Sequence, residues 1–155
     1  MLKYLNFPDT PLGDLSITHD GSQLLSLRFQ LEDHSTGNFS VFDQRIQSAV
    51  TAYLDLPTYA FDLSFKLLGT PFQQSVWQAL LEIPLGQTLT YGGLAKKLNT
   101  SARAIGNACR NNPLPLIIPC HRIVAANGLG GYCGAVSGDP IQNKCWLLKR
   151  EGAKF

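Results

Sequence analysis

The stretch Leu68-Gly69-Thr70-Pro71-Phe72-Gln73 marks a change in the character of this 155-residue sequence. Thr70 is a favourable N-cap, Pro71 suits the first helical position, and Gln73 stands where a capping box has its second partner. The stretch therefore predicts a helix from Phe72 to Leu81. A chain of this length can form one large domain or two small ones, and we place a boundary between residues 1–65 and 66–155.

Residues 1–65 predict a small sheet with one helix. Apolar residues alternate in 12–18 and recur in 24–29, with an Asp-Gly turn signal between them, which indicates a β-hairpin. Apolar side chains at helical spacing predict a helix over residues 41–54, and residues 63–65 are a candidate short strand.

The histidines of this part, His19 and His34, stand apart from other chemically active residues. Neither belongs to a group that could form a catalytic or metal site. We therefore interpret both as solvent-exposed residues of a turn and a loop.

Residues 66–155 predict a helix-turn-helix. A short extended piece at 88–91 precedes helical segments at 94–98 and 102–110, which the capping residues Asn99-Thr100-Ser101 separate. In the second helix one face is small or apolar and another is polar: Ala102, Ile105, Gly106 and Cys109 share the first, and Arg103, Asn107 and Arg110 share the second. Such a helix either approaches nucleic acid closely, with arginines on phosphates, or packs its small face inside the domain.

The net charge of +2 conceals an asymmetry between the two parts. Residues 1–65 carry three basic and eight acidic side chains, a net charge of −5, whereas residues 66–155 carry ten basic and three acidic ones, a net charge of +7. The basic part fits a surface that meets a polyanion such as nucleic acid, although a solvated lysine-rich face would have the same composition.

Chemistry centres on Pro119-Cys120-His121-Arg122-Ile123-Val124. The preceding Leu116-Ile117-Ile118 predicts a short buried strand that ends at the proline. A thiol reacts as the thiolate, which cationic or proton-accepting neighbours favour, so Cys120 beside His121 and Arg122 is a candidate nucleophile. The alternative is a buried structural cysteine, since free cysteine is among the most buried residue types.

The composition is that of an ordinary folded protein, with 45% hydrophobic and 15% charged residues. There is no signal-peptide pattern and no apolar run near the ~20 residues that cross a bilayer. We therefore expect no membrane association and a cytoplasmic location. The four cysteines, Cys109, Cys120, Cys133 and Cys145, lack zinc-site spacing, and no secretory context favours disulfides.

Several short motifs follow one another in order across residues 69–152. They are Gly69-Thr70-Pro71-Phe72-Gln73, Val76-Trp77, Ile83-Pro84, Thr90-Tyr91, Ala102-Arg103-Ala104-Ile105-Gly106, Asn112-Pro113, Pro119-Cys120-His121-Arg122, Gly131-Tyr132, and Trp146-Leu147-Leu148 before Glu151-Gly152. With this set the sequence resembles the O6-alkylguanine-DNA alkyltransferases, or methylated-DNA–protein-cysteine methyltransferases. The resemblance implies a two-domain α/β protein: a ribonuclease-H-like sheet-and-helix domain, then a winged-helix or helix-turn-helix domain.

The resemblance also implies the reaction. Cys120 would accept the alkyl group of O6-alkylguanine, and possibly of O4-alkylthymine, in one in-line displacement. His121 would relay the thiol proton through a water, Glu151 would hold His121, and Asn112 would brace the site. The product is a thioether, so each molecule would act once, with no cofactor and no metal. The residues expected to line the base pocket are Tyr132, Cys133, Gly134 and Ile123.

The expected partner is double-stranded DNA that contains O6-alkylguanine, bound by a monomer. The substrate base lies within the duplex, so it must be flipped out. By resemblance, the small-residue helix enters the minor groove, Arg103 fills the vacated place in the stack and Tyr91 crowds the adjoining phosphate. Gly92, Asn107 and Arg110 would complete the DNA contacts.

Four features are left open. The turn Asn99-Thr100-Ser101 is shorter than is usual in the family, and residues 137–143 form a longer loop than in many relatives. Cys133 is a spectator, an oxidation partner of Cys120 or a change that widens the pocket. Arg122 either forms a structural ion pair or stabilises the thiolate.

Two other functions compete with repair by alkyl transfer. One is a non-enzymatic module that recognises alkylated bases and recruits other factors; Cys120 argues against it, because relatives of that kind lack the cysteine. The other is a thiol hydrolase, which needs an oxyanion hole that nothing in the sequence indicates.

Overall fold

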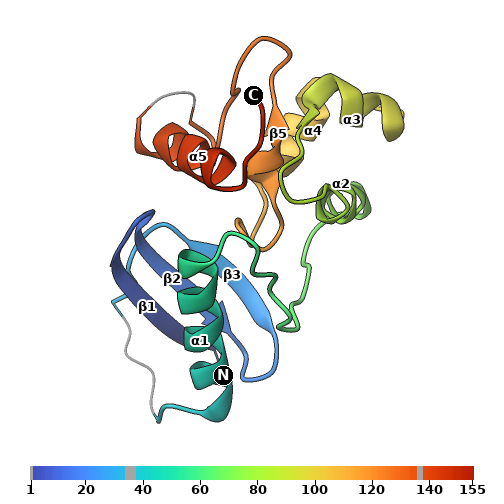
Figure 1. Ribbon diagram of the computed structural model, residues 1–155. Coiled ribbons are helices and arrows are strands. Elements are labelled where there is room, and N and C mark those ends of the chain that lie inside the picture. The colour runs from blue at the N-terminus through green and yellow to red at the C-terminus, as the bar shows by residue number, and fades with distance from the viewer. Residues whose placement is uncertain (1, 34–37, 136–137) are drawn as a thin grey trace. The chain divides into compact units, whose positions relative to one another are not determined.

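The computed structural model describes residues 2–33, 38–135 and 138–155. It forms two compact units, Met1–Leu68 and Gly69–Phe155, so the observed division falls slightly beyond the boundary placed from the sequence. The fold is mixed α/β (Figure 1). The elements in order are β1 (Lys3–Thr10), β2 (Gly13–His19), β3 (Leu24–Arg28), α1 (Val41–Asp55), α2 (Pro71–Leu81), β4 (Leu89–Thr90), α3 (Tyr91–Lys97), α4 (Ala102–Arg110), a 3₁₀ turn (Cys120–Arg122), β5 (Ile123–Val124) and α5 (Asp139–Arg150).

The first unit contains an antiparallel sheet with the strand order β1-β2-β3. The pairing of β2 with β3 confirms the predicted hairpin. The sequence did not indicate β1, whose register with β2 shifts between Phe7 and Thr10, around Pro8. The candidate strand at residues 63–65 is reduced to one isolated bridge, between Phe65 and Leu24.

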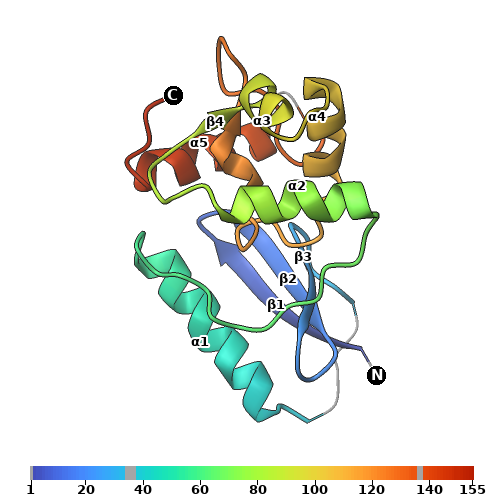
Figure 2. The ribbon, with the colours of Figure 1, turned by 90° about the vertical axis from the view of Figure 1, so that its right-hand side faces the viewer.

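Helix α1 covers one face of this sheet in both ribbon views (Figure 2). It confirms the predicted helix, and Ser40 and Asp43 form a capping box at its start. Its inward side chains Ile46 and Val50 are buried, as are Leu15 and Ile17 of β2. The apolar face of the helix therefore forms one core with the sheet.

The prediction for His19 was wrong: its side chain is fully buried. Its Nε2 lies 2.7 Å from Asp43 Oδ1, and its Nδ1 accepts a hydrogen bond from the Gly21 N–H at 3.1 Å. The strand period of two places residue 19 on the same face as Leu15 and Ile17, and Asp43 supplies the polar partner that burial requires. His34 lies outside the described residues.

The second unit is built around a parallel pair of very short strands, β4 and β5. Helix α4 packs against α2 and α3, and the 3₁₀ turn packs against α2 and α5. The predicted start of α2 is confirmed, since Thr70 and Gln73 form the capping box and Pro71 opens the helix. Trp77 of α2 is buried, and its indole N–H donates to the carbonyl of Ala108 in α4 at 2.9 Å.

The strand predicted at Leu116-Ile117-Ile118 is absent. Only an isolated bridge joins Pro115 to Ile118, and Leu116 has a positive φ of 76°. Prolines on either side of the run provide no N–H for a ladder, so the segment turns instead. The Asn112 side chain closes that turn, because it accepts from Leu114 N–H and donates to the Ile118 carbonyl, both at 2.9 Å.

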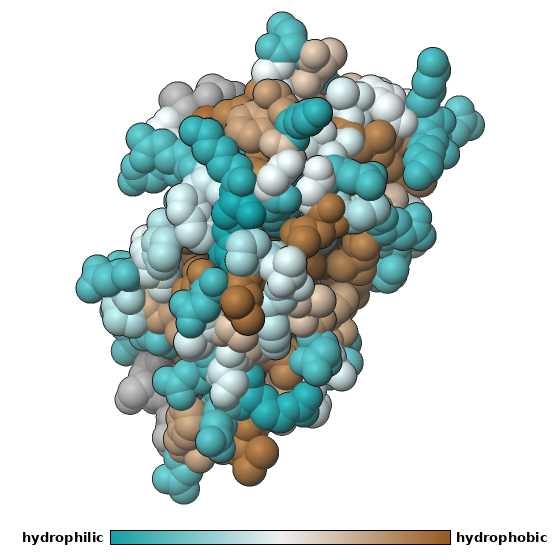
Figure 3. Space-filling model, in the orientation of Figure 1, coloured by the Kyte–Doolittle hydropathy of each residue, from teal (hydrophilic) through white to brown (hydrophobic). Residues whose placement is uncertain are grey.

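The surface drawn in Figure 3 is mixed, with hydrophilic residues interspersed among smaller apolar groups. Single apolar side chains remain exposed, such as Phe39, Val41 and Leu56. Scattered exposure of this kind is normal. Across the described residues, no helix combines the length and the hydropathy that a bilayer crossing requires.

Candidate active site

Cys120 begins the 3₁₀ turn that follows the closed loop at residues 112–118. Its side chain is only 5% exposed, and its N–H donates to the Ile118 carbonyl at 2.8 Å. Burial raises the pKa of the thiol to about 11, although a hydrogen bond with the Asn112 side chain and the charge of Lys144 oppose the rise. Asn112 thus both fixes the loop and favours the thiolate.

His121, next in the chain, is fully buried and directed at Glu151. Its Nε2 lies 2.8 Å from Glu151 Oε2. Burial alone raises the pKa of Glu151, but hydrogen bonds from His121 and Arg122 outweigh it and lower that pKa to about 2. Because the carboxylate is therefore ionised, it accepts a hydrogen bond, and the His121 proton resides on Nε2.

The other ring nitrogen of His121, Nδ1, has no hydrogen-bond partner within the described part of the chain. Burial lowers the pKa of His121, and the hydrogen bond and charge of Glu151 oppose this only in part. A neutral imidazole held through Nε2 presents Nδ1 as a lone-pair acceptor. The arrangement can therefore take up a proton beside Cys120, with Glu151 stabilising the imidazolium that results.

Arg122 faces Glu151 as well, and this decides between the two roles left open for it. Its Nε donates to Glu151 Oε1 at 2.9 Å and its Nη2 to Oε2 at 3.2 Å, while Nη1 donates to the Ile83 carbonyl at 2.8 Å. The planar guanidinium matches the carboxylate in a two-point contact. Arg122 therefore forms a structural ion pair that orients Glu151.

A cavity of about 310 Å³ opens over Cys120. It brings together most of the residues expected to bind DNA or the base. Its lining consists of Tyr91, Arg103, Gly106, Asn107, Cys109, Arg110, Cys120, Gly131, Tyr132, Cys133, Gly134 and Ala135.

Five expected residues lie outside this lining, among them His121 and Glu151, which pair with each other. Ile123 is fully buried in β5, where it pairs with Leu89. Gly92 is exposed near the start of α3. Asn112 is in the loop that supports Cys120.

Helix α4 confirms the predicted range, 102–110, but not the predicted division of its faces. Gly106 and Cys109 line the same cavity as Arg103, Asn107 and Arg110, and Ala102 is exposed. The buried residues are Ile105 and Ala108. Because α4 packs on α2 and α3 through these two, small and basic side chains together face the cavity.

The wall opposite α4 is a tight turn in which Tyr132 pairs with Ala135. Both central residues have positive φ, 52° at Cys133 and 80° at Gly134, the pattern of a type I′ turn. A Cβ on Gly134 would lie 3.1 Å from Arg110 Nε. The glycine therefore lets this turn approach the arginine side chain of α4 closely.

Tyr91 at the start of α3 lies inside the cavity rather than on an open surface. Its hydroxyl donates to the Gly131 carbonyl at 3.3 Å. Burial, followed by the neighbouring Cys109 and Cys120, raises the pKa of Tyr91 to about 12. The phenol therefore stays protonated at neutral pH and remains a hydrogen-bond donor.

Lys144 of α5 is the residue that sequence reasoning missed. It is fully buried, and its Nζ donates to the carbonyls of Ile123 at 2.5 Å and Gly131 at 2.8 Å. Burial lowers the pKa of Lys144 to about 8, against the effect of Cys120, Cys109 and Cys133. The available signal was the spacing, because Lys144 stands three residues before Leu147 and a helix places both on the same side.

The structure shows the conformation of the turn at residues 99–101 and of most of the segment at residues 137–143. Asn99 adopts a left-handed conformation with φ of 55°, and Thr100 N–H closes the turn on the Ala95 carbonyl at 2.9 Å. Residues 139–143 belong to α5, so most of the segment expected to be a loop over the pocket is helical. Ser137 lies outside the described residues.

No group of three or more metal-ligating side chains occurs among the residues with described positions. The four cysteines are free thiols, and Cys133 is the exposed one. The site can provide a nucleophile in Cys120, a base in His121, an orienting carboxylate in Glu151 and a cavity for a ligand.

Comparison with known proteins finds one family that matches most of the second unit, and relatives that match most of the chain. Residues 71–153 match the family model described as "6-O-methylguanine DNA methyltransferase, DNA binding domain". The chain is 38% identical to a methylated-DNA–protein-cysteine methyltransferase of Mycobacterium tuberculosis, over 83% of each chain.

Solved structures give the same result for the fold. An O6-methylguanine methyltransferase of Mycobacterium tuberculosis superimposes with a TM-score of 0.82 at 35% identity, covering 98% of this chain and 93% of that one. The same organism's OGT in complex with DNA matches with a TM-score of 0.80 at 34% identity, over 97% and 92% of the two chains.

Proposed function

The chain belongs to the 6-O-methylguanine DNA methyltransferase family, and we propose that it repairs DNA by moving an alkyl group from guanine O6 to Cys120. The observation that carries the assignment of roles is that His121, which follows the buried Cys120 in the 3₁₀ turn, has no partner for its Nδ1 among the described residues. A base held from behind by a carboxylate, next to a nucleophile, is the arrangement that nucleophilic catalysis needs.

The reaction is a single displacement. His121 Nδ1 takes the thiol proton, directly or through one water, and Glu151 stabilises the imidazolium. The Cys120 sulfur attacks the alkyl carbon, the bond from that carbon to O6 breaks, and the proton held by His121 is available to the departing guanine. The product is a thioether, which the site has no means of cleaving, so one molecule repairs one base without cofactor or metal.

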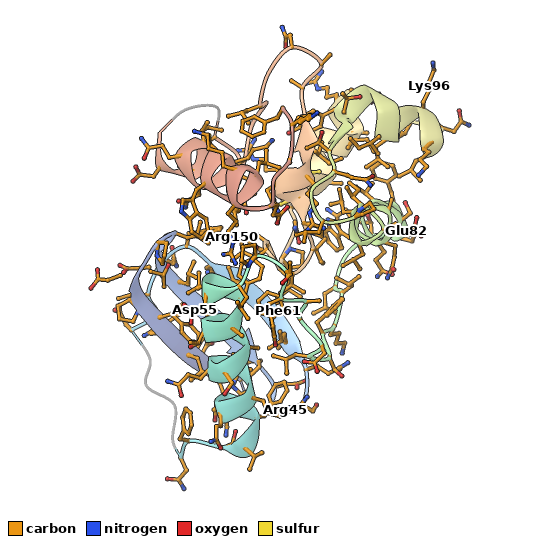
Figure 4. All side chains as sticks on the ribbon, viewed as in Figure 1. Arg45, Asp55, Phe61, Glu82, Lys96 and Arg150 are labelled. Atoms are coloured by element: carbon orange, nitrogen blue, oxygen red, sulfur yellow. The ribbon has the colours of Figure 1, made fainter. Side chains whose placement is uncertain are left out.

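The substrate base reaches Cys120 by leaving the duplex. The cavity is about 310 Å³, and Tyr91, Tyr132 and the backbone of Cys133 and Gly134 would hold the flipped base there. Arg103 at the start of α4 would occupy the vacated position, while Asn107 and Arg110 on the same helix would meet the backbone. The exposed Lys96 side chain extends away from α3 (Figure 4).

The finer assignments follow from family membership. We assign a winged-helix character to the second unit, with α3 and α4 as its helix-turn-helix and Gly92 contacting DNA, and a ribonuclease-H-like character to the first. The partner is double-stranded DNA with O6-alkylguanine or O4-alkylthymine, bound by a monomer in the cytoplasm. The C-terminal unit carries the site.

The deciding experiment measures mass. Duplex DNA with one O6-methylguanine is incubated with the protein and with a Cys120→Ala control, and each cysteine peptide is weighed. We expect the Cys120 peptide to gain one methylene, about 14 Da, at no more than one per molecule. Tight DNA binding with no gain on any peptide would instead favour a recognition module, and a gain on Cys133 would identify a different acceptor.

Base flipping has its own test in Arg103→Ala. This variant should lose at least about tenfold in the rate of repair in duplex DNA, because nothing then holds the base out of the stack. Its reaction with free O6-benzylguanine, which needs no flipping, should stay within about twofold of the parent. Equal losses on both substrates would contradict the role given to Arg103.

A further inference from the structure

Lys144 lies between the acceptor and the wall of the cavity, and the mechanism above does not use it. One of its carbonyl acceptors belongs to Ile123, which directly follows the Cys120–Arg122 turn. The other belongs to Gly131, next to Tyr132. The ammonium group also lies 5.8 Å from the centre of the Tyr91 ring. Its position is therefore fixed by both sides of the site.

Within residues 2–33, 38–135 and 138–155, the charge on Lys144 has no carboxylate counterion. The ion pairs of the described residues involve other side chains, and none includes Lys144. Burying a cation without a carboxylate costs free energy, and a chain can avoid that cost with an apolar residue of similar length. Lys144 is nevertheless 0% exposed. Such an uncompensated charge requires an explanation.

The acidic groups that face Lys144 are thiols and one phenol. Cys120 of the 3₁₀ turn, Cys109 of α4 and Cys133 of the cavity wall each raise its pKa, and Lys144 lowers the pKa of each thiol in return. Tyr91 of α3 shares the Gly131 carbonyl with it. The negative charge that can form nearest to Lys144 is therefore a thiolate.

We propose that Lys144 is a positioning residue that supplies the positive charge needed by the Cys120 thiolate during alkyl transfer, an inference that rests on Cys120 being the acceptor. Proton transfer from Cys120 to His121 creates two charges. The imidazolium is paired with Glu151 at 2.8 Å, and the thiolate is paired with the ammonium group anchored on Ile123 and Gly131. Each new charge thus meets a fixed opposite charge, and Glu151 also offsets the repulsion between Lys144 and the His121 imidazolium, an effect that lowers the pKa of His121.

Cys109 and Cys133 share the field of Lys144 but not the base, because only Cys120 precedes His121 in the 3₁₀ turn. Lys144 therefore lowers the energy of a thiolate in this cavity, and His121 determines which thiol ionises. Two independent groups, one providing charge and one accepting the proton, would distinguish Cys120 from its neighbours.

The test measures thiolate formation without DNA. In a protein that carries Cys109→Ser, Cys133→Ser and Cys145→Ser, iodoacetamide can modify only Cys120, and the rate is followed against pH. Lys144→Met should lower the rate near pH 7.5 about tenfold, because Lys144 carries its charge at that pH and favours the thiolate. The two rates should converge as the pH rises above about 8, where Lys144 loses its own proton.

A matched control is Lys149→Met, which removes the same charge from an exposed position of α5. Its pH profile should coincide with that of the parent. If Lys144 served only to hold the fold, Lys144→Met would lower the rate at every pH without shifting the profile, and that result would overturn the inference.

If Lys144→Met does not fold, the reciprocal measurement decides. Coupling between two charges is mutual, so a negative charge at position 120 must raise the pKa of Lys144. In Cys120→Asp, which places a carboxylate at the acceptor position, nitrogen-15 NMR of the Lys144 ammonium should report a higher pKa than in Cys120→Ser. An unchanged pKa would overturn the inference. Normal methyl transfer to Cys120 with no shift in either titration would reject the role of Lys144 and leave the proposed function standing.

Discussion

The two units each contain a fully buried histidine that faces a carboxylate through Nε2, yet only one of them is equipped for chemistry. His19 lies 2.7 Å from Asp43, and His121 lies 2.8 Å from Glu151. The difference is at Nδ1. That of His19 accepts a hydrogen bond from Gly21, whereas that of His121 has no partner among the described residues.

The two carboxylates also differ in their other hydrogen-bond partners. Asp43 caps the start of α1, where it accepts hydrogen bonds from both the hydroxyl and the N–H of Ser40. Glu151 is held by Arg122, which fixes its position without using the histidine's second nitrogen. A buried histidine with both nitrogens bonded stabilises a fold, and one with a free acceptor can move a proton. Burial alone does not distinguish them.

The largest expected effect comes from Glu151→Gln. Without the carboxylate, the tautomer of His121 is no longer fixed and its imidazolium is not stabilised. We expect the rate of methyl transfer to Cys120 to fall by about 10²–10⁴-fold, measured by peptide mass in single-turnover experiments. Asp43→Asn makes the same change in the first unit, and its rate per folded molecule should equal that of the parent. A loss below tenfold in Glu151→Gln would contradict the distinction.

The next effect is a loss of stability in acid. The pKa of Glu151 is lowered from 4.5 to about 2 in the folded protein, so its stabilising contribution is complete above pH 4.5 and disappears as the pH falls to about 2. Asp43, whose pKa is lowered from 3.8 mainly by Ser40 against the effect of burial, contributes in the same direction.

The free energy of unfolding, measured by urea titration between pH 6 and pH 2, should therefore fall as acid is added. Glu151→Gln should remove more of this slope than Asp43→Asn, because its partners displace the Glu151 pKa further. His121 adds a loss that begins below its ordinary pKa of 6.5, since burial lowers its pKa in the folded state. Equal slopes in the two carboxylate variants would show that the clusters do not differ in this respect.

A smaller effect is expected from His19→Leu. It removes the partner of Asp43 and the acceptor of the Gly21 N–H, so the free energy of unfolding should fall by about 1–3 kcal/mol. Methyl transfer by the molecules that remain folded should not change. A transfer rate reduced more than about tenfold at full folding would mean that His19 takes part in the reaction.

The smallest effect is expected from Ser40→Ala, which removes the N-cap of α1. The Ser40 hydroxyl accepts from Asp43 N–H at 3.1 Å, and losing such a cap costs about 1 kcal/mol. Thr70→Ala does the same at α2, where Thr70 accepts from Gln73 N–H at 3.1 Å. Thermal unfolding should show similar decreases for the two. A decrease at Ser40 several times larger would show that the cap also holds the His19–Asp43 contact.

Most helices of this protein could be predicted from the sequence because their signals are local. Ser40 with Asp43, and Thr70 with Pro71 and Gln73, mark helix starts within four residues. The prediction of a strand at residues 116–118 was wrong, because apolar residues between prolines are equally compatible with a buried turn. Strand β1 was missed because its pairing with β2 needs an irregularity near Pro8.

The candidate site was predictable only in part. Motif order predicted an acceptor, a base and a carboxylate, and the structure brings His121 and Glu151 together as expected. It also lines one cavity with Cys120, Tyr132, Cys133 and most of the expected DNA-contacting residues. Ile123 is instead buried in β5, outside that lining. Lys144 was missed because a lysine in an amphipathic helix ordinarily reaches solvent.

The sequence by itself determined the family, the identity of the candidate nucleophile and the starts of α1, α2 and α4, but not that of α3, which begins at Tyr91 and not at residue 94. Only the tertiary structure decided that Nδ1 of His19 is hydrogen-bonded, that Nδ1 of His121 has no partner among the described residues, and that the Lys144 ammonium group is buried. The physical reason is distance along the chain. The partners of His19, His121 and Lys144 lie 24, 30 and 21 residues away, so a local pattern cannot show which hydrogen bonds they form. Burial and pairing, which set the protonation of these groups, arise only when those segments pack together.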